Sequence, residues 1–160
     1  MNVRLSVEER FWTKVQKTDT CWMWAGSDTG WSGYGSFWLD GKLQLAHRVS
    51  HELHHGPIPS GMEVDHVCHN RLCVRPDHLR LASHKQNNEN HQGARRDSTC
   101  GVRGVTWHKK GRKWQAMVRH NGRDYYCGLF STLEDAEAAV IAKRNELFTH
   151  NDLDRMESDA

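Results

Sequence analysis

The sequence has 160 residues, a formal net charge of +2 and 37% hydrophobic residues, with a mean hydropathy of −0.81. This length allows one ordinary domain or two small ones, and small cores usually need a staple such as a bound metal. No apolar run is long enough to span a membrane, and the first ten residues lack a signal-peptide core, so we expect an intracellular, cytoplasmic protein with no membrane partner. The five cysteines therefore predict metal ligands or buried thiols rather than disulfides.

The positive charge is concentrated in the C-terminal half. Between residues 93 and 130 there are nine Lys and Arg against two acids, whereas the last ten residues carry four acids and one Arg. A locally basic segment of this kind favours a polyanion as the partner of the C-terminal half.

The N-terminal half predicts short elements separated by turn residues. The first is a helix over 6–15 with a Ser6–Glu9 capping box, and its apolar stripe consists of Phe11, Trp12 and Val15. The elements that follow are a strand at 34–39, its return at 42–47 across an Asp40-Gly41 turn, a helix at 47–55 ended by Gly56, a strand at 62–67, a loop at 68–76, a strand at 79–82 and a helix opened by Ser83 and Gln86.

The C-terminal half predicts a three-stranded antiparallel sheet packed on one helix. In the middle strand, apolar residues alternate with Gln115, Met117 and Arg119, so one face can join a core and the other can meet a ligand. The elements are strands at 102–107, 113–119 and 125–130, with an Asn121-Gly122 hairpin turn, and a helix from 131 to 148. The acidic tail at 151–160 is expected to be frayed or disordered.

The predicted fold class is therefore α+β. The expected organisation is a metal-stapled module over 1–90, a linker over 91–101, the sheet-and-helix module over 102–150 and the acidic tail over 151–160.

Cysteine and histidine spacing indicates a structural metal site. Cys68, Cys73 and His78 lie within eleven residues, at spacings typical of zinc ligands. Structural zinc takes four ligands, and Cys21 is the best fourth because it lies in the same half of the chain. The alternative is that these cysteines are buried apolar thiols.

A second set of groups in the same stretch suits the hydrolysis of phosphodiesters. His66 follows Asp65, and a neutral imidazole can take a proton from water near neutral pH. The carboxylate of Asp65 and the side-chain oxygen of Asn87 can share one Mg²⁺-like ion. Arg48 either reaches a phosphate oxygen or pairs with Glu52, one turn further along its helix.

Three stretches resemble the HNH endonucleases, and more narrowly the His-Cys box branch of the ββα-metal nucleases that is common among homing endonucleases. They are AHR at 46–48, GPIPSGMEVDH at 56–66 and HVCHNRLCVRPDHL at 66–79, and the resemblance covers the chain from Phe11 to Asn90. It implies His66 as general base, with Cys68, Cys73 and His78 as zinc ligands. It further implies Asn87 as catalytic-metal ligand, Asp65 sharing that ion, and Arg48 stabilising the cleaved phosphate. Where many members have Asn this chain has His78, which moves the catalytic-metal role to Asn87.

The stretch from Gly101 to Val140 resembles the Apetala/ethylene-response-factor-type DNA-binding domain, a family that lays its three-stranded sheet into the major groove. Arg103, Arg119 and Tyr126 match DNA-facing positions of that family. Other family positions are replaced, so the target sequence of the family is not carried over; the replacing residues are Thr106, Met117 and Asp124. Independently, basic turn residues beside the outer sheet face predict DNA contacts by Lys109, Lys110, Arg112 and Gln115, and the alternative is a solvated basic face.

The two resemblances together predict a metal-dependent endonuclease of the homing or mobile-element kind. It would cut double-stranded DNA in the host cell of a phage or mobile element, with a structural Zn²⁺ and a catalytic Mg²⁺ or similar ion. The alternatives are a non-cleaving, sequence-specific DNA-binding regulator built on a decayed nuclease fold, and a nuclease without sequence preference. A monomer and a homodimer are both compatible with the sequence.

Overall fold

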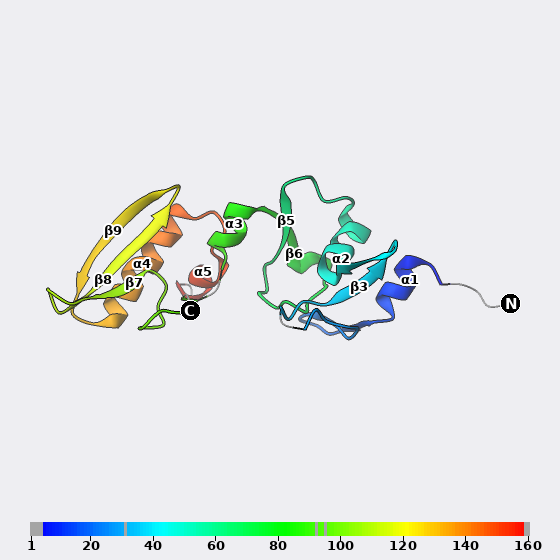
Figure 1. Ribbon diagram of the computed structural model, residues 1–160, viewed down its shortest axis with the longest axis horizontal. Helices are drawn as coiled ribbons and strands as arrows, with labels where there is room; N and C mark the ends of the chain where they lie inside the picture. Colours follow the sequence, from blue (N-terminus) through cyan, green and yellow to red (C-terminus); the bar gives the residue numbers. More distant parts are fainter. Residues whose placement is uncertain (1–4, 31, 92, 95, 159–160) are drawn as a thin grey trace. The chain divides into compact units, whose positions relative to one another are not determined.

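The computed structural model describes residues 5–30, 32–91, 93–94 and 96–158. The chain divides into two compact units, Met1–His84 and Lys85–Ala160, and each combines helices with small antiparallel sheets (Figure 1). The expected α+β class is therefore confirmed. Residues 85–90, which we assigned to the first module from the sequence, group by their contacts with the second unit. Among the helices of the described ranges, none is both long and apolar enough to cross a membrane.

The first unit is built from short hairpins and two helices. Its strands pair as β1–β2, β3–β4 and β5–β6, each a two-stranded antiparallel sheet. In chain order the elements are α1 (Val7–Trp12), β1 (Val15–Lys17), β2 (Trp22–Trp24), β3 (Ser36–Leu39), β4 (Lys42–Leu45), α2 (Ala46–His55), β5 (Met62–His66), the 3-10 helix η1 (Pro76–His78) and β6 (Leu79–Ser83).

Helix α1 begins as its sequence predicts and ends earlier. The Ser6 hydroxyl accepts from the Glu9 amide, and the Glu9 carboxylate accepts from the Ser6 amide, which completes the capping box. The prediction that Val15 continues the helix is wrong, because Val15 is in β1 and pairs with Trp24. A β-branched residue opposite a large aromatic side chain gains packing in a strand.

The core of the first unit is mainly aromatic. Phe11 is fully buried, and its ring centroid lies 5.0 Å from that of Trp24 and 5.2 Å from that of Phe37. Val49 of α2 and Val74 of the loop after β5 join the same cluster. Helix α1, two hairpins, α2 and the loop between β5 and η1 thus share one core.

Two hairpins of this unit contribute to the candidate site, one closed by a tight turn and the other by a long loop. Asp40 (φ 49°) and Gly41 (φ 77°) form the tight turn between β3 and β4, as Asp-Gly predicts. Strands β5 and β6 pair Asp65 with Arg80 and His66 with Leu79. The loop between these two strands therefore begins and ends at neighbouring positions.

The second unit is a three-stranded antiparallel sheet, in the order β7–β8–β9, with α4 across one face (Figure 1). A bulge between Ala116 and Met117 places Cys127 as the extra residue on β9. The elements are α3 (His84–Glu89), whose first residue ends the first unit, β7 (Val105–His108), β8 (Lys113–His120), β9 (Arg123–Phe130), α4 (Leu133–Leu147) and α5 (Asp152–Ser158). The core consists of Val105, Ala116, Val118, Ala136, Val140 and Phe148.

The prediction of a frayed or disordered acidic tail is wrong for residues 151–158, whereas 159 and 160 lie outside the described residues. Helix α5 begins at Asp152, and Asn151 before it is buried. Asp154 forms an ion pair with the buried Arg144 of α4, at 2.5 Å between Oδ2 and Nε. An acidic stretch is unfavourable as an isolated helix, but a buried cationic partner on another element stabilises it.

Candidate metal and nuclease site

The structure brings together the four residues that we predicted as a zinc site. One ligand atom from each of Cys21, Cys68, Cys73 and His78 lies within 4.8 Å of all the others. The His78 Nδ1 atom is 3.7 Å from the Cys21 sulfur and 3.6 Å from the Cys73 sulfur. A tetrahedral zinc with bonds of roughly 2.0–2.3 Å separates its ligands by roughly 3.5–3.8 Å, so these residues fit a Cys3His zinc site.

Backbone pairing explains why distant Cys21 joins the loop. The Trp24 amide donates to the Leu72 carbonyl at 2.9 Å, and the Val74 amide donates to the Trp22 carbonyl at 2.8 Å. Strand β2 therefore pairs with the loop on both sides of Cys73. Within the loop, the Asn70 side chain accepts from the Leu72 amide at 3.1 Å and fixes the turn between the two loop cysteines.

The three cysteine thiols of the cluster shift one another's pKa values. A hydrogen bond from the Cys68 thiol lowers the pKa of Cys73 to about 4 and raises the pKa of Cys68 above its ordinary value. Burial, followed by the neighbouring Cys73, also raises the pKa of Cys21. A soft divalent metal binds cysteine as the thiolate, so its binding would release the protons that these thiols carry.

His66 lies at the end of β5, where the main chain of the metal loop fixes its ring. Its Nε2 atom is 3.0 Å from the carbonyl oxygen of Cys73. Because a carbonyl oxygen can only accept, Nε2 carries the proton and Nδ1 keeps its lone pair. Burial lowers the pKa of His66, while the Cys73 carbonyl opposes that shift. The neutral ring is therefore the prevailing form, and it presents a basic nitrogen.

A second buried histidine, His47, lies beside His66, although it was not among the predicted site residues. The ring centroids of His47 and His66 are 4.8 Å apart, and the Tyr34 ring lies 5.1 Å from His47. Burial, followed by the neighbouring His66 and Arg48, lowers the pKa of His47 to about 3. His47 is thus neutral at physiological pH and adds no positive charge beside His66. The AHR tripeptide at the start of α2 is the only signal that could have indicated it.

Asp65 is buried, and its carboxylate is bound to a residue that spacing alone does not single out. Arg80, its cross-strand partner, donates from Nε and Nη2 to Oδ2 at 3.1 and 2.9 Å. A carboxylate oxygen shared with a guanidinium is a weaker ligand for a divalent cation. Of the two predicted ligands of the catalytic ion, Asn87 is therefore expected to bind it more strongly than Asp65.

Two further predicted residues lie on helices. Arg48 is half-buried in the first turn of α2 beside His47, and among the described residues it forms no ion pair with Glu52. Asn87 is in α3, a helix that belongs almost entirely to the second unit. The shared site of Asp65 and Asn87 stays a prediction, although carboxylate and amide oxygens are suitable ligands for a hard divalent ion.

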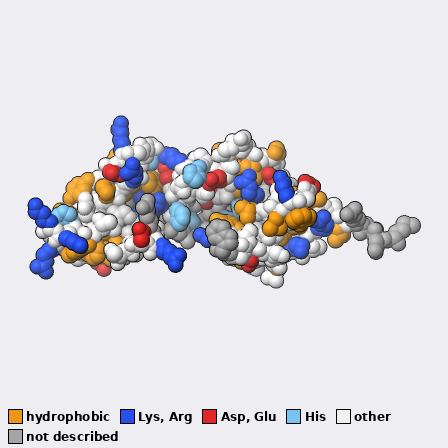
Figure 2. Space-filling view, viewed as in Figure 1, with side chains coloured by type: hydrophobic (Ala, Val, Ile, Leu, Met, Phe, Trp, Pro, Cys, Tyr) orange, Lys and Arg blue, Asp and Glu red, His pale blue; other side chains and the backbone are white. Residues whose placement is uncertain are grey.

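The sheet face opposite α4 carries three of the predicted DNA-contacting residues, Gln115, Arg119 and Tyr126. Arg119 is exposed and 3.5 Å from Asp124, whereas Gln115 is half-buried and Tyr126 is 60% exposed. Met117 and Leu129, which were not predicted as contacts, are exposed beside them. The turn between β7 and β8 contributes Lys109, Lys110 and Arg112, and Lys and Arg side chains gather at this end of the second unit (Figure 2).

Arg103, the remaining predicted DNA contact, lies outside that face, and its contact with DNA stays a prediction. It precedes β7, and its guanidinium donates to the main-chain carbonyls of Asn88, Glu89 and His91. The matching of sequence positions placed it on the sheet, whereas both of its terminal nitrogens donate to main-chain carbonyls at and just beyond the end of α3.

Comparisons with known proteins agree with the site in the first unit. A protein-family model described as HNH endonuclease matches residues 44–89. The chain is 35% identical over 84 residues to protein 3.8 of Escherichia phage T7, covering 52% of this chain and 69% of that protein. It is 32% identical over 119 residues to an uncharacterized HNH endonuclease of Acanthamoeba polyphaga mimivirus, covering 74% of this chain and 60% of that protein.

The chain spans about half the length of two further relatives. It covers 54% of protein 7.7 and 58% of protein 2.8, both of Escherichia phage T7, at 39% and 34% identity over 44% and 52% of its own length. No solved structure matches the chain.

Proposed function

The chain belongs to the family of phage proteins that includes protein 3.8 of Escherichia phage T7 and carries an HNH endonuclease domain, and from this premise we propose that it is a metal-dependent DNA endonuclease. Its substrate would be double-stranded DNA, and its biological setting a phage or a mobile element of the homing kind. The first unit would be a zinc-stapled ββα-metal nuclease module, and the second would help to select the site of cleavage.

The hydrogen bond between His66 and the Cys73 carbonyl carries this proposal. This hydrogen bond keeps the proton on Nε2, so the lone pair of Nδ1 is available to accept a proton from water. The hydroxide oxygen then bonds to phosphorus as the bond to the 3′ oxygen breaks, and a proton from solvent neutralises the leaving oxygen. Burial of His66 lowers its pKa and favours the unprotonated base.

Residues for the catalytic ion and the phosphate complete the proposed site. Asp65 and Asn87 would hold the ion, with Arg48 directed to a phosphate oxygen. When bound, a divalent cation supplies charge neutralisation at the scissile phosphate and at the leaving oxygen. The Cys3His cluster would hold zinc, which joins β2 to the loop whose main chain orients His66.

The open face of the β7–β8–β9 sheet supports a role in DNA binding. It combines an exposed aromatic ring, Tyr126, with Arg119 and the basic β7–β8 turn. Basic side chains bind phosphates without regard to sequence, whereas contacts from a sheet face reach base edges. The second unit would therefore supply both affinity and the choice of target.

A plasmid-cleavage assay with His66→Ala tests the catalytic role. In Mg²⁺ the wild-type chain should convert supercoiled plasmid to nicked or linear forms, and chelator should stop the reaction. His66→Ala should cut at least about 100-fold more slowly, which is the lower range for loss of a general base, while binding DNA normally. His54→Ala is the matched control, because it removes an exposed histidine of α2.

The outcomes separate the alternatives. Cleavage by His66→Ala at the wild-type rate would refute the mechanism. DNA binding without any cleavage by the wild-type chain would instead indicate the non-cleaving regulator, and smearing of long DNA would indicate a nuclease without sequence preference.

A further inference from the structure

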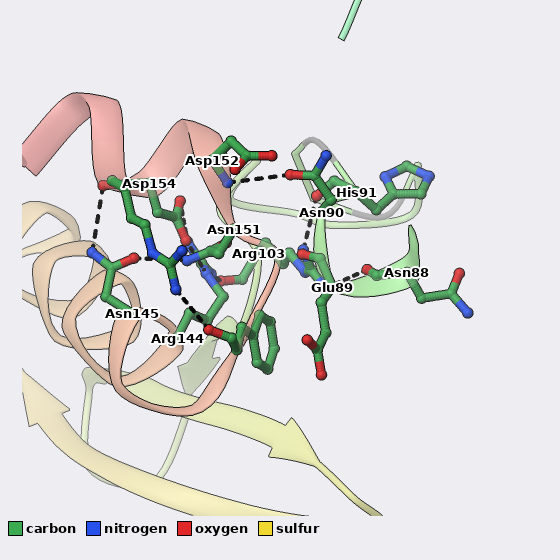
Figure 3. A network of polar contacts seen from close by, with 12 residues as sticks. Asn88, Glu89, Asn90, His91, Arg103, Arg144, Asn145, Asn151, Asp152 and Asp154 are labelled. Atoms are coloured by element: carbon green, nitrogen blue, oxygen red, sulfur yellow. Dashed lines mark hydrogen bonds and ion pairs between the residues drawn. The ribbon is translucent and has the colours of Figure 1, made fainter. Parts of the chain in front are cut away.

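The C-terminal end of α3 is held by Arg103, a half-buried arginine of the second unit. The Nη1 atom of Arg103 donates to the carbonyl oxygens of Glu89 at 3.0 Å and His91 at 2.8 Å, and Nη2 donates to that of Asn88 at 3.1 Å (Figure 3). The last carbonyls of a helix have no partner within the helix and are usually satisfied by water or a glycine cap. Here one guanidinium serves three carbonyl groups at and just beyond the helix end.

The side chain of Glu89 fixes the same helix from a second direction. Glu89 is 5% exposed, and its Oε2 atom accepts from the Thr149 amide at 3.1 Å. Its Oε1 atom lies 3.1 Å from Lys85 Nζ and 3.4 Å from His120 Nε2. Main chain and side chain of α3 are thus bound to different elements of the second unit, which restrains both the position of the helix and its rotation.

The network continues to the C-terminal helix. The Arg144 Nη1 atom donates to the Arg103 carbonyl at 2.8 Å, and Asp154 of α5 accepts from Arg144 (Figure 3). The Asp152 amide donates to the Asn90 side chain at 3.2 Å. Buried charges are unfavourable unless they are fully paired, so this linked set holds one arrangement of α3 against alternatives.

We infer that Arg103 and Glu89 are positioning residues for Asn87. This inference rests on the proposed function, in which Asn87 holds the catalytic divalent ion. Asn87 is one residue before Asn88 and two before Glu89, and a slip of one residue along a helix turns a side chain by about 100°. By fixing the helix end, Arg103 and Glu89 set the rotation of α3 within the second unit, and with it the direction of the Asn87 side chain.

Arg103→Gln and Glu89→Gln, each in the full chain, test this inference. The matched control is Lys143→Gln, which removes a cation of the same unit that pairs with Glu146 rather than with α3. The first readout is amide hydrogen exchange of residues 85–90, which needs no activity. The second is the Mg²⁺ concentration for half-maximal cleavage at saturating DNA, and the third is DNA affinity in chelator.

Both variants should exchange residues 85–90 faster and need about 10- to 100-fold more Mg²⁺, as is typical when a group that orients a metal ligand is lost. Lys143→Gln should match the wild-type chain in all three readouts. Arg103→Lys should recover part of the Mg²⁺ dependence, because an ammonium can still donate to one or two of the carbonyls. DNA affinity in chelator should stay within about twofold of wild type, since this guanidinium is turned to the protein's own carbonyls.

Several results would overturn the inference. Unchanged exchange, or faster exchange with a wild-type Mg²⁺ requirement, would show that α3 is not positioned by this network for catalysis. If Arg103→Gln fails to fold, the milder Glu89→Gln decides by the same criteria. If the wild-type chain never cuts DNA, the proposed function fails, and the positioning of Asn87 fails with it even where the exchange result is as expected.

Discussion

The buried ion pair between Arg144 and Asp154 supports a quantitative prediction about the second unit. The Arg144 side chain is 7% exposed and that of Asp154 is 14% exposed. Two N–H groups of Arg144 bind the two carboxylate oxygens at 2.5 and 3.0 Å, and a third binds the Arg103 carbonyl. Arg144→Gln removes the charge and shortens the side chain, so it leaves a largely buried carboxylate without its cation.

Removal of one partner of a buried ion pair lowers the free energy of unfolding by about 3–5 kcal/mol. Because Asp154 keeps some contact with water, we expect the lower end for Arg144→Gln, about 3 kcal/mol. Asp154→Asn should have a smaller effect, about 2 kcal/mol, since the amide oxygen can still accept and Arg144 keeps the Arg103 carbonyl. The double variant should be less unstable than the sum of the two by about 1–2 kcal/mol.

Hydrogen exchange of the slowest amides in β8 measures this free energy within the full chain. A chain of two compact units does not have to unfold in one step, so a single denaturation curve would mix their stabilities. Lys143→Gln, which affects an exposed pair on the same helix, should leave exchange unchanged. A loss below about 1 kcal/mol for Arg144→Gln, or strict additivity in the double variant, would refute the view that α5 is docked by this pair.

Three other predictions concern the metal site, the aromatic core and the basic turn. Purified protein should contain about one zinc per chain by elemental analysis, and Cys21→Ser should lower that content and the thermal stability of the first unit. Phe11→Ala should destabilise the first unit by about 3–5 kcal/mol, measured by hydrogen exchange of the slowest amides of that unit, with a smaller effect for Phe11→Leu, because the ring is fully buried. Lys109→Gln should reduce the slope of log affinity for DNA against log salt by about one, and an unchanged slope would place the β7–β8 turn away from the phosphates.

The elements that could be predicted from the sequence are those fixed by residues close together in the chain. The Asp40-Gly41 and Asn121-Gly122 pairs adopt positive φ at both residues, so their chemistry alone identifies two hairpins. Cys21 could be predicted as a fourth ligand because few residue types bind zinc. These are positions where residue type and spacing leave only one or two physical solutions.

Interactions between distant elements explain what could not be predicted. Helix α5 depends on Arg144, ten residues before Asp154, and the acidic composition of the tail alone favours disorder. Arg103 has the residue type of a DNA contact, and only the position of the α3 carbonyls reveals its partner. His47 and Arg80 become neighbours of the candidate site through α2 and the β5–β6 register, which spacing in the sequence does not contain.

Cys73 connects the two halves of the proposed nuclease site through two different atoms. Its sulfur belongs to the Cys3His cluster, whereas its carbonyl oxygen accepts from His66 Nε2. The two roles are separable, because the carbonyl remains when the side chain is changed, but its position depends on the β2–loop pairing that the cluster reinforces. A metal that preserves the tetrahedral geometry should therefore preserve the orientation of His66, whereas loss of the metal would free the loop and disturb the base before the aromatic core around Phe11 unfolds. In the proposed site, a bound zinc would therefore help to orient the general base, because both depend on the conformation of the same loop.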